Sequence, residues 1–507
     1  MLSLSAAEKQ ALPSSPSRGL RGSEEGSAPR HLRTQASGVP AAALLSSPEA
    51  LRAAGWGALH AVLGLGTAKY WSHLNKTQRD LYFLYYQPFL PMLAMLWLWG
   101  TAVRFWERRR IRYDVCFLSE DQRYLLRSGQ LFQIANVLSS IVLSSGLAFV
   151  YLLAYGLPHL AAYLPGALYC SLLALFLFPG NLLERDSRLF FGRTLWRIVT
   201  PLRSVTWADF LLADVLTSLA KALSDTERAV CHLMTGFVMV PQIKACSDAS
   251  YIIPLGLAAP YAWRLVQCIR VYLDTGARPQ LFNALKYSTA FPVIALSAVK
   301  YHVSQAAWRG FYKPLWLGAA LLNSAYSFFW DVERDWEISF FTQLGQQRGA
   351  LLPSPVLRST ALFRRPFYLY LMASNLVLRL GWLYRLSPHL RHHHAVVTLM
   401  VLVEAFRRFQ WLFVRIEVEL RKIQAQRPEV GVLVPAAPPA YPVHPMDAAA
   451  HAHAGGSDRG GGADSGSEEE GGGGPRHGGI AAPRGREKKA SAGARMLPLV
   501  DLNPLPR

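Results

Sequence analysis

Residues 131–155 read LFQIANVLSSIVLSSGLAFVYLLAY and contain no charged side chain. As a helix, this stretch extends about 37 Å at 1.5 Å per residue, which exceeds the roughly 30 Å thickness of the hydrocarbon core of a bilayer. An uncharged apolar run of this length is typical of a transmembrane helix. The stretch therefore predicts a membrane protein.

Eight further apolar stretches surround this one, at residues 81–103, 160–178, 207–239, 251–269, 284–302, 314–330, 366–386 and 395–414. The nine together predict an all-α fold, a polytopic transmembrane helical bundle. The stretch 207–239 is too long for one straight crossing and contains charges, so it is either one broken helix or a short hairpin; we expect one broken crossing. Residues 51–71, apolar but rich in glycine, are either a tenth crossing or an interfacial helix, and we favour the crossing.

The two ends of the chain differ sharply from this middle region. Residues 1–50 and 425–507 are rich in Gly, Ser, Pro and Ala and are expected to be disordered, which leaves 51–424 as the transmembrane domain. The 507 residues include 53 Lys and Arg against 33 Asp and Glu, a net charge of +20. The basic residues lie in short clusters between apolar runs, without a nucleic-acid-binding motif, so membrane topology explains the charge better than a nucleic acid partner.

Basic residues are concentrated in alternate connections between the spans. Connections within 104–127, 185–203, 270–278 and 334–365 are rich in arginine, whereas the others contain little beyond Lys244, Arg309, Lys313 and Arg391. By the positive-inside rule, the arginine-rich set and the C-terminal tail face the cytosol. A tenth crossing would place both termini there.

The cysteines and histidines predict no metal centre. The cysteines show no paired spacing, so we expect neither a disulfide nor a zinc framework; they are Cys116, Cys170, Cys231, Cys246 and Cys268. Histidines at 389 and 392–394 fit no standard site and are expected to be solvated. We expect no cofactor.

Charged residues inside the apolar stretches are the candidates for function, because an ionisable group at bilayer depth costs a few kcal/mol. With neighbouring hydroxyl and indole side chains they form five groups along the chain: Asp214 and Thr217; Lys286 and Tyr287; Asp331 and Asp335; Arg379 and Trp382; Glu404, Arg407 and Arg408. Glu404 shares a helical face with both neighbouring arginines, as Asp214 does with Thr217.

These groups have simpler explanations one by one. Lys286, Asp331 and Asp335 lie near span ends, where side chains reach interfacial water. The three arginines have apolar sequence on both sides and would form either structural ion pairs or a ligand site. Together, however, the groups predict a cavity of positive potential, and guanidinium forks match phosphate oxygens. We therefore favour a small oxyanion as ligand, with carboxylates orienting the arginines.

Motifs in the same stretches resemble the EXS domain family, the membrane module of eukaryotic phosphate exporters. They are WRIVTPLRSVTWADFLLADVLTSL from residue 196, WRLVQCIRVYLDTGARPQLFNALKYSTAF from 263, FFWDVERDWEI from 328, NLVLRLGW from 375 and EAFRRFQWLFVRIEVE from 404. The resemblance covers about residues 80–424. It implies an inorganic phosphate pathway through the later helices, lined by the candidate residues above, with Trp382 acting in gating and Thr217 standing where a family member has Asn.

The resemblance also implies a biological setting. Large family members carry an SPX domain, a sensor of inositol pyrophosphates, and the polar segment before the first clear span is too short for one. Members without it act in the Golgi and return phosphate to the cytosol. We therefore expect a phosphate transporter of the Golgi membrane, with the plasma membrane and other endomembranes open as locations and a homodimer open as assembly.

Two functions of other classes stay open. One is a trafficking factor that retains Golgi glycosyltransferases, with the arginines as structural ion pairs. The other is a phosphotransferase with Asp331 and Asp335 as metal ligands. Because no nucleophile or general base is paired with these two carboxylates, we expect that the protein is not an enzyme.

Overall fold

The computed structural model describes residues 48–241, 243–247, 249–341, 363, 365–387, 389–390 and 393–431. The chain divides into two compact units, Met1–Gly55 and Trp56–Arg507, and the following concerns the second. Most of the predicted disordered ends lies outside the described residues.

The elements, all helical in this part, are α2 (Pro48–Trp71), α3 (Lys76–Tyr86), α4 (Phe89–Arg109), η1 (Tyr113–Cys116), α5 (Ser119–Gln122), α6 (Ser128–Ala154), α7 (Pro158–Ala161), α8 (Tyr163–Leu177), α9 (Arg185–Val199), α10 (Trp207–Ser218), α11 (Ala220–Thr235), η2 (Lys244–Cys246), α12 (Ile252–Thr275), α13 (Pro279–Ser288), α14 (Ala290–Val299), α15 (Gln305–Ala307), η3 (Trp308–Tyr312), α16 (Lys313–Trp330), η4 (Asp331–Asp335), α18 (Arg365–Arg379), η5 (Gly381–Leu386) and α19 (His394–Gln426).

The bundle is a helical membrane protein. Four stretches in the described part are long and apolar enough to cross a bilayer, namely α4, α6, Pro158–Leu177 (α7 and α8) and α12. The other predicted spans coincide with helices that are interrupted, short or charged, so length and composition alone do not support nine crossings. Apolar side chains such as Leu65, Leu177 and Leu255 are 67–72% exposed, as expected for a surface that faces lipid rather than water.

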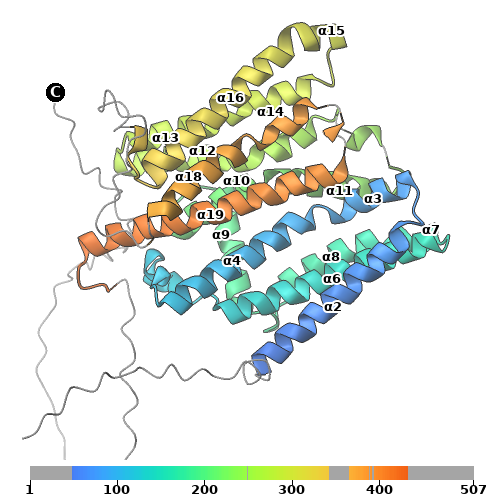
Figure 1. Ribbon diagram of the computed structural model, residues 1–507, viewed down its shortest axis with the longest axis horizontal. Coiled ribbons are helices and arrows are strands. Elements are labelled where there is room, and N and C mark those ends of the chain that lie inside the picture. Colours follow the sequence, from blue (N-terminus) through green and yellow to red (C-terminus); the bar gives the residue numbers. More distant parts are fainter. Residues whose placement is uncertain are drawn as a thin grey trace, which may run out of the picture. The chain divides into compact units, whose positions relative to one another are not determined.

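Two of the predicted spans are broken in the middle. Residues 207–239 form α10 and α11, which meet at Leu219 (φ −95°, ψ 7°) and follow one another along the long axis of Figure 1. Only Leu219 separates them, so the stretch is one interrupted helix; that it crosses the membrane once stays a prediction. Residues 284–302 are likewise divided at Thr289 into α13 and α14. Irregular backbone at membrane depth is tolerated only where protein or a polar cavity covers it.

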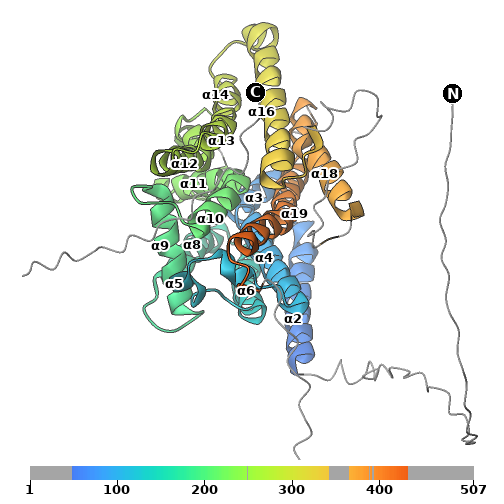
Figure 2. The same ribbon diagram turned by 90° about the vertical axis from the view of Figure 1, so that its left-hand side faces the viewer.

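Helix α19 is central to the packing. It lies against α4, α10 and α18, and Figures 1 and 2 both show it between them. Its Trp411 is fully buried in one aromatic cluster with Trp106, Trp207 and Trp336. Each tryptophan buries on the order of 150–250 Å². This packing fixes the rotation of α19 and so determines which of its side chains face the interior.

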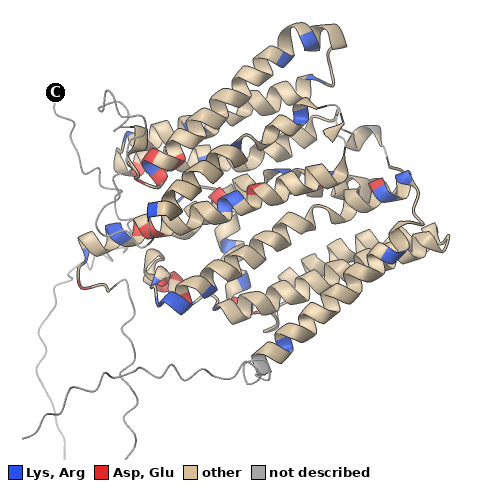
Figure 3. Cartoon of the chain, viewed as in Figure 1, with Lys and Arg blue, Asp and Glu red and all other residues tan. Residues whose placement is uncertain are grey.

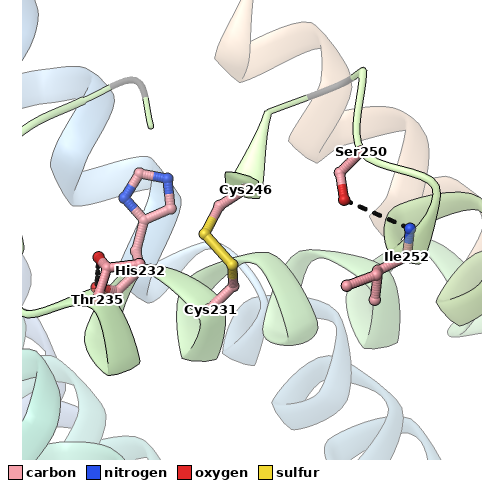
Figure 4. The surroundings of a disulfide bond; sticks show 6 residues. All are labelled: Cys231, His232, Thr235, Cys246, Ser250 and Ile252. Carbon is pink, nitrogen blue, oxygen red and sulfur yellow. Dashed lines mark hydrogen bonds between the residues drawn. A yellow bond between two sulfur atoms is a disulfide. The ribbon is translucent and has the colours of Figure 1, made fainter. Parts of the chain in front are cut away.

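A disulfide joins Cys231 of α11 to Cys246 of η2 (Figure 4), so the expectation of no disulfide is wrong. The Cα atoms are 5.9 Å apart although 15 residues separate the cysteines in sequence. Helix α11 ends at Gly236, whose φ of +75° is accessible to glycine without strain, and the chain then returns along the helix. A disulfide is stable in an oxidising compartment, which agrees with the prediction that this arginine-poor connection lies away from the cytosol.

Candidate anion site

Asp214 of α10 is the first centre of the site. It is 1% exposed, and three side chains from three other helices contact its carboxylate. Arg264 Nε of α12 lies 2.6 Å from Oδ1, the Tyr287 hydroxyl of α13 donates to Oδ1 at 2.6 Å, and Arg408 Nη1 of α19 lies 3.1 Å from Oδ2. One buried carboxylate therefore holds four helices together.

Asp331, at the start of the π-helix η4, is the second centre. Arg379 of α18 contacts it with Nε at 3.1 Å and also with Nη2. Asn375 Nδ2 donates to the same carboxylate at 3.0 Å, and Arg407 Nη1 lies 3.5 Å away. Arg407 also donates two hydrogen bonds to Glu404, from Nε to Oε2 at 2.8 Å and from Nη2 to Oε1 at 2.6 Å. Its guanidinium thus bridges two carboxylates.

The break after α10 connects the two centres. Ser218, the last residue of α10, accepts a hydrogen bond from Arg408 Nε at 2.9 Å and donates one to Glu404 Oε1 at 2.8 Å. Thr217 accepts from Arg408 Nη2 at 3.2 Å and donates to the Asp214 carbonyl at 2.7 Å. Arg408 therefore uses all three nitrogens of its guanidinium in one continuous network.

Lys286 and Asp335 form one end of the network. Lys286 Nζ lies 3.9 Å from Asp335 Oδ2, which also accepts a hydrogen bond from Trp411 Nε1 at 3.1 Å. The ammonium lies over the ring of Tyr287, 4.4 Å from its centroid, and 5.7 Å from that of Trp330. Both residues are at least 90% buried, so the explanation that they reach interfacial water is not supported.

Trp382 lies at the other edge, in η5. Its Nε1 donates to Ser324 Oγ of α16 at 2.9 Å, and its ring contacts that of Trp316 edge to face at 5.6 Å. Ser324 Oγ in turn approaches the Arg379 carbonyl at 3.4 Å. Trp382 thus contacts the backbone that carries Arg379 through one intermediate residue, and its gating role stays a prediction.

All eleven predicted residues lie in or beside this network, but sequence reasoning missed Arg264, Gln267, Ser218 and Asn375. Arg264 is 2% exposed, and its Nη1 donates to Gln267 Oε1 at 2.6 Å. The signal was present, since Arg264 is a charge inside the apolar stretch 251–269. With it, the network, which we call the ionic core, contains five cationic and four anionic side chains: Arg264, Lys286, Arg379, Arg407 and Arg408, and Asp214, Asp331, Asp335 and Glu404.

The electrostatics of the ionic core follow from this composition. Its one formal excess positive charge favours an anion, and every arginine is already paired with a carboxylate. Such pairing offsets the cost of removing the charges from water. Figure 3 shows charged residues of both signs in the middle of the bundle as well as at the helix ends. An incoming oxyanion would compete with the carboxylates for hydrogen bonds from the guanidinium groups.

The histidines lie apart from the ionic core. His389 and His393 are exposed, whereas His394 Nε2 lies 3.0 Å from Asp80 Oδ1 and its ring stacks on Phe83 at 4.6 Å. His394 is therefore more ordered than a solvated cluster implies. His392 lies outside the described residues, among which no three His, Cys, Asp or Glu side chains are grouped to hold a metal ion.

The model of the EXS family matches residues 82–420, which include every residue of the ionic core. The chain belongs to the EXS family. Its likeness to individual members is moderate: 32% identity over 227 residues to an ERD1 homologue of Schizosaccharomyces pombe (42% of this chain, 54% of the relative), 29% over 357 residues to a phosphate transporter PHO1 homologue of Arabidopsis thaliana (66% and 43%), and 29% over 348 residues to a xenotropic and polytropic retrovirus receptor 1 homologue of Danio rerio (65% and 48%). The chain thus matches about half the length of these EXS relatives.

Proposed function

We propose that this EXS protein transports inorganic phosphate across a membrane through the ionic core. The observation that carries the proposal is the buried network in which cationic side chains outnumber carboxylates by one. Guanidinium groups bind tetrahedral oxyanions with paired hydrogen bonds. Relatives named phosphate transporters support phosphate as the anion. In this proposal the protein performs no covalent chemistry.

The carboxylates make binding reversible in this mechanism. Without phosphate, Asp214, Asp331 and Glu404 neutralise the arginines; with phosphate, its oxygens replace some of these contacts. Glu404 is the most accessible of them, because its side chain is 33% exposed whereas those of Asp214 and Asp331 are 1–2% exposed. Exchange therefore begins at Glu404 and Arg407. A transport site has to bind strongly enough to admit the ion and weakly enough to release it.

The helix breaks supply the movement. The ionic core draws Asp214 from α10, which ends at the break before α11, and Asp331 and Asp335 from η4, a π-helix of the kind that often marks functional sites. We propose nine crossings, with α2 as a tenth and the arginine-rich connections in the cytosol. We further propose a Golgi location, in line with the likeness to an ERD1 homologue, and in that topology a flux of phosphate from the lumen to the cytosol.

Phosphate flux into proteoliposomes tests the proposal. Full-length protein should give saturable uptake of labelled phosphate, and Arg379→Ala or Arg408→Ala should abolish it. Arg270→Ala is the control, because Arg270 lies on α12 outside the ionic core, and its side chain is 36% exposed and pairs with Asp274 on the same helix. Folded wild-type protein that moves neither phosphate nor sulfate would overturn transport and favour the role in retention of Golgi enzymes.

A further inference from the structure

Helices α18 and α19 enclose an aromatic groove on the side opposite the ionic core. The groove has a volume of about 250 Å³ and is lined by Phe406, Phe409 and Phe413 of α19, Phe367 and Leu371 of α18, and Phe105 of α4. At 100° per residue, positions 406, 409, 410 and 413 lie on the face of α19 opposite positions 404, 407, 408 and 411. The same helix therefore presents charges to one side and aromatic rings to the other.

The groove suits an apolar chain. An apolar cavity of roughly 150 Å³ is already large enough to bind benzene. Phe406 is 40% exposed at the margin, so the groove opens to the surroundings of the bundle. In the topology proposed above, on which this inference rests, residues 395–414 cross the membrane, so those surroundings are the hydrocarbon core of the bilayer. The occupant is therefore a membrane lipid rather than a soluble ligand.

The cytosolic end of the groove is positively charged. Arg109, in the last turn of α4, lies over Phe105, with Cζ 5.7 Å from the ring centroid. Phe105 in turn contacts Phe363, which precedes α18, and Phe413, at centroid distances of 5.9 and 5.3 Å. A cation thus lies at the end of an apolar groove, the arrangement that complements a lipid with an acyl chain and an anionic headgroup.

We propose that the aromatic groove binds an anionic glycerophospholipid of the cytosolic leaflet, with one acyl chain between α18 and α19 and the headgroup phosphate at Arg109. The site is coupled to the ionic core through Gln410, which also lines the groove. Gln410 accepts a hydrogen bond from Ser374 Oγ at 2.8 Å and donates to the Tyr370 hydroxyl at 2.9 Å. The lipid therefore stabilises the contact between α18 and α19 that places Asn375 against Asp331.

Photolabelling in nanodiscs tests the site. The full chain is placed in phosphatidylcholine nanodiscs with a trace of phosphatidylserine that carries a diazirine at the end of one acyl chain, and labelled peptides are identified by mass spectrometry. We expect labelling in the segment 406–413, competed by unlabelled phosphatidylserine about fivefold better than by phosphatidylcholine, because one basic residue near an anionic headgroup contributes about 1 kcal/mol. Labelling outside the groove, or equal competition by both lipids, would overturn the proposal.

Three variants test whether Arg109 binds the headgroup and whether the groove binds the acyl chain. Arg109→Gln should remove the preference for phosphatidylserine, whereas Arg108→Gln, one residue away and about 100° around α4, should retain it. Phe406→Trp fills the groove from its exposed margin and should reduce labelling by both lipids. Equal effects of the two arginine substitutions, or unchanged labelling of Phe406→Trp, would contradict the model. Since labelling is measured without phosphate, its outcome is independent of the proposed transport.

Discussion

Two buried regions of the molecule satisfy their polar groups in opposite ways. The region around Tyr85, Tyr86 and Phe149, in α3 and α6, is a cluster of buried apolar and aromatic side chains and is called here the neutral core. Its tyrosines donate to backbone carbonyls, Tyr85 to Val238 at 2.7 Å and Tyr86 to Ser145 at 3.2 Å. The ionic core, built from later helices, instead brings together nine charged side chains, of which all but Glu404 are at most 14% exposed.

The comparison shows that α3 and α6 pack through apolar contacts and tyrosine hydrogen bonds, without the carboxylate that joins four helices at Asp214. Association of helices in a membrane rests on close packing and hydrogen bonds, both of which the neutral core has. Burying ion pairs costs desolvation that their attraction only partly offsets, and apolar replacements often stabilise a protein. Stability is therefore a weak explanation for these charges, and anion transport is the task that we propose for them.

The largest expected effect is that of Asp214→Ala. It leaves Arg264 and Arg408 without their shared carboxylate, and loss of one partner of a buried pair costs about 3–5 kcal/mol. We expect that loss in the free energy of unfolding in detergent and a loss of phosphate flux of about a hundredfold or more. Tyr85→Phe in the neutral core, which removes one hydrogen bond to the Val238 carbonyl, should cost only about 1 kcal/mol. Equal destabilisation by both would remove the distinction between the cores.

Removal of the disulfide tests whether the neutral core can be destabilised without an effect on the ionic core. Val238 and Met239, in the loop that the Cys231–Cys246 bond closes, pack against the neutral core. Closing a 15-residue loop contributes about 3 kcal/mol to the free energy of unfolding. Cys231→Ser should therefore lower that free energy by roughly this amount without changing the KM for phosphate. Cys170→Ser, at an exposed free cysteine, is the control and should change neither. A changed KM in Cys231→Ser would show that the two cores are coupled.

Glu404→Gln probes the exchange of carboxylate for phosphate. Glutamine keeps the shape of the side chain but weakens its hold on Arg407, so phosphate meets a weaker competitor. A charge-assisted hydrogen bond contributes about 1.5–3 kcal/mol, so we expect the KM for phosphate uptake to fall about tenfold and the maximal rate to fall with slower release. Glu419→Gln is the matched control, because Glu419 pairs with Arg415 on the same helix outside the ionic core. A raised or unchanged KM would argue that Glu404 is purely structural.

The sequence predicted the site best where a residue type is energetically unfavourable in its surroundings. Charges inside apolar stretches are expensive, so Asp214, Lys286 and Arg408 stood out, and the structure brings them together. The excess length of 207–239 likewise predicted the broken helix. Arg264 was missed although the same rule applies to it, because the group it belongs to, with Gln267, is evident only once α12 lies beside Asp214.

Other features depend on tertiary structure and leave no local signal. The disulfide requires the reversal after Gly236, which brings Cys246 back to α11. Nothing in the sequence 331–335 distinguishes a π-helix from an α-helix. The pairing of each arginine with a carboxylate depends on how five elements pack, which is why the sequence predicted a positive cavity and not the nearly neutral network observed.

The smallest expected effect comes from a matched pair of tyrosines. Tyr86→Phe removes hydrogen bonds to Ser145 O and Oγ at 3.2 and 3.0 Å but keeps the ring stacked on Tyr82, so it should cost about 1 kcal/mol of stability and leave flux unchanged. Tyr287→Phe removes one hydrogen bond to a charged group, Asp214 at 2.6 Å, and should reduce flux about tenfold because such bonds contribute about 1.5–3 kcal/mol. The chemical change is identical in both, so only the surrounding charges differ. If both variants transport like the wild type, the hydroxyl of Tyr287 does not position Asp214 for anion exchange. If only Tyr287→Phe is impaired, transport depends on the polar groups of the ionic core and not on those of the neutral core.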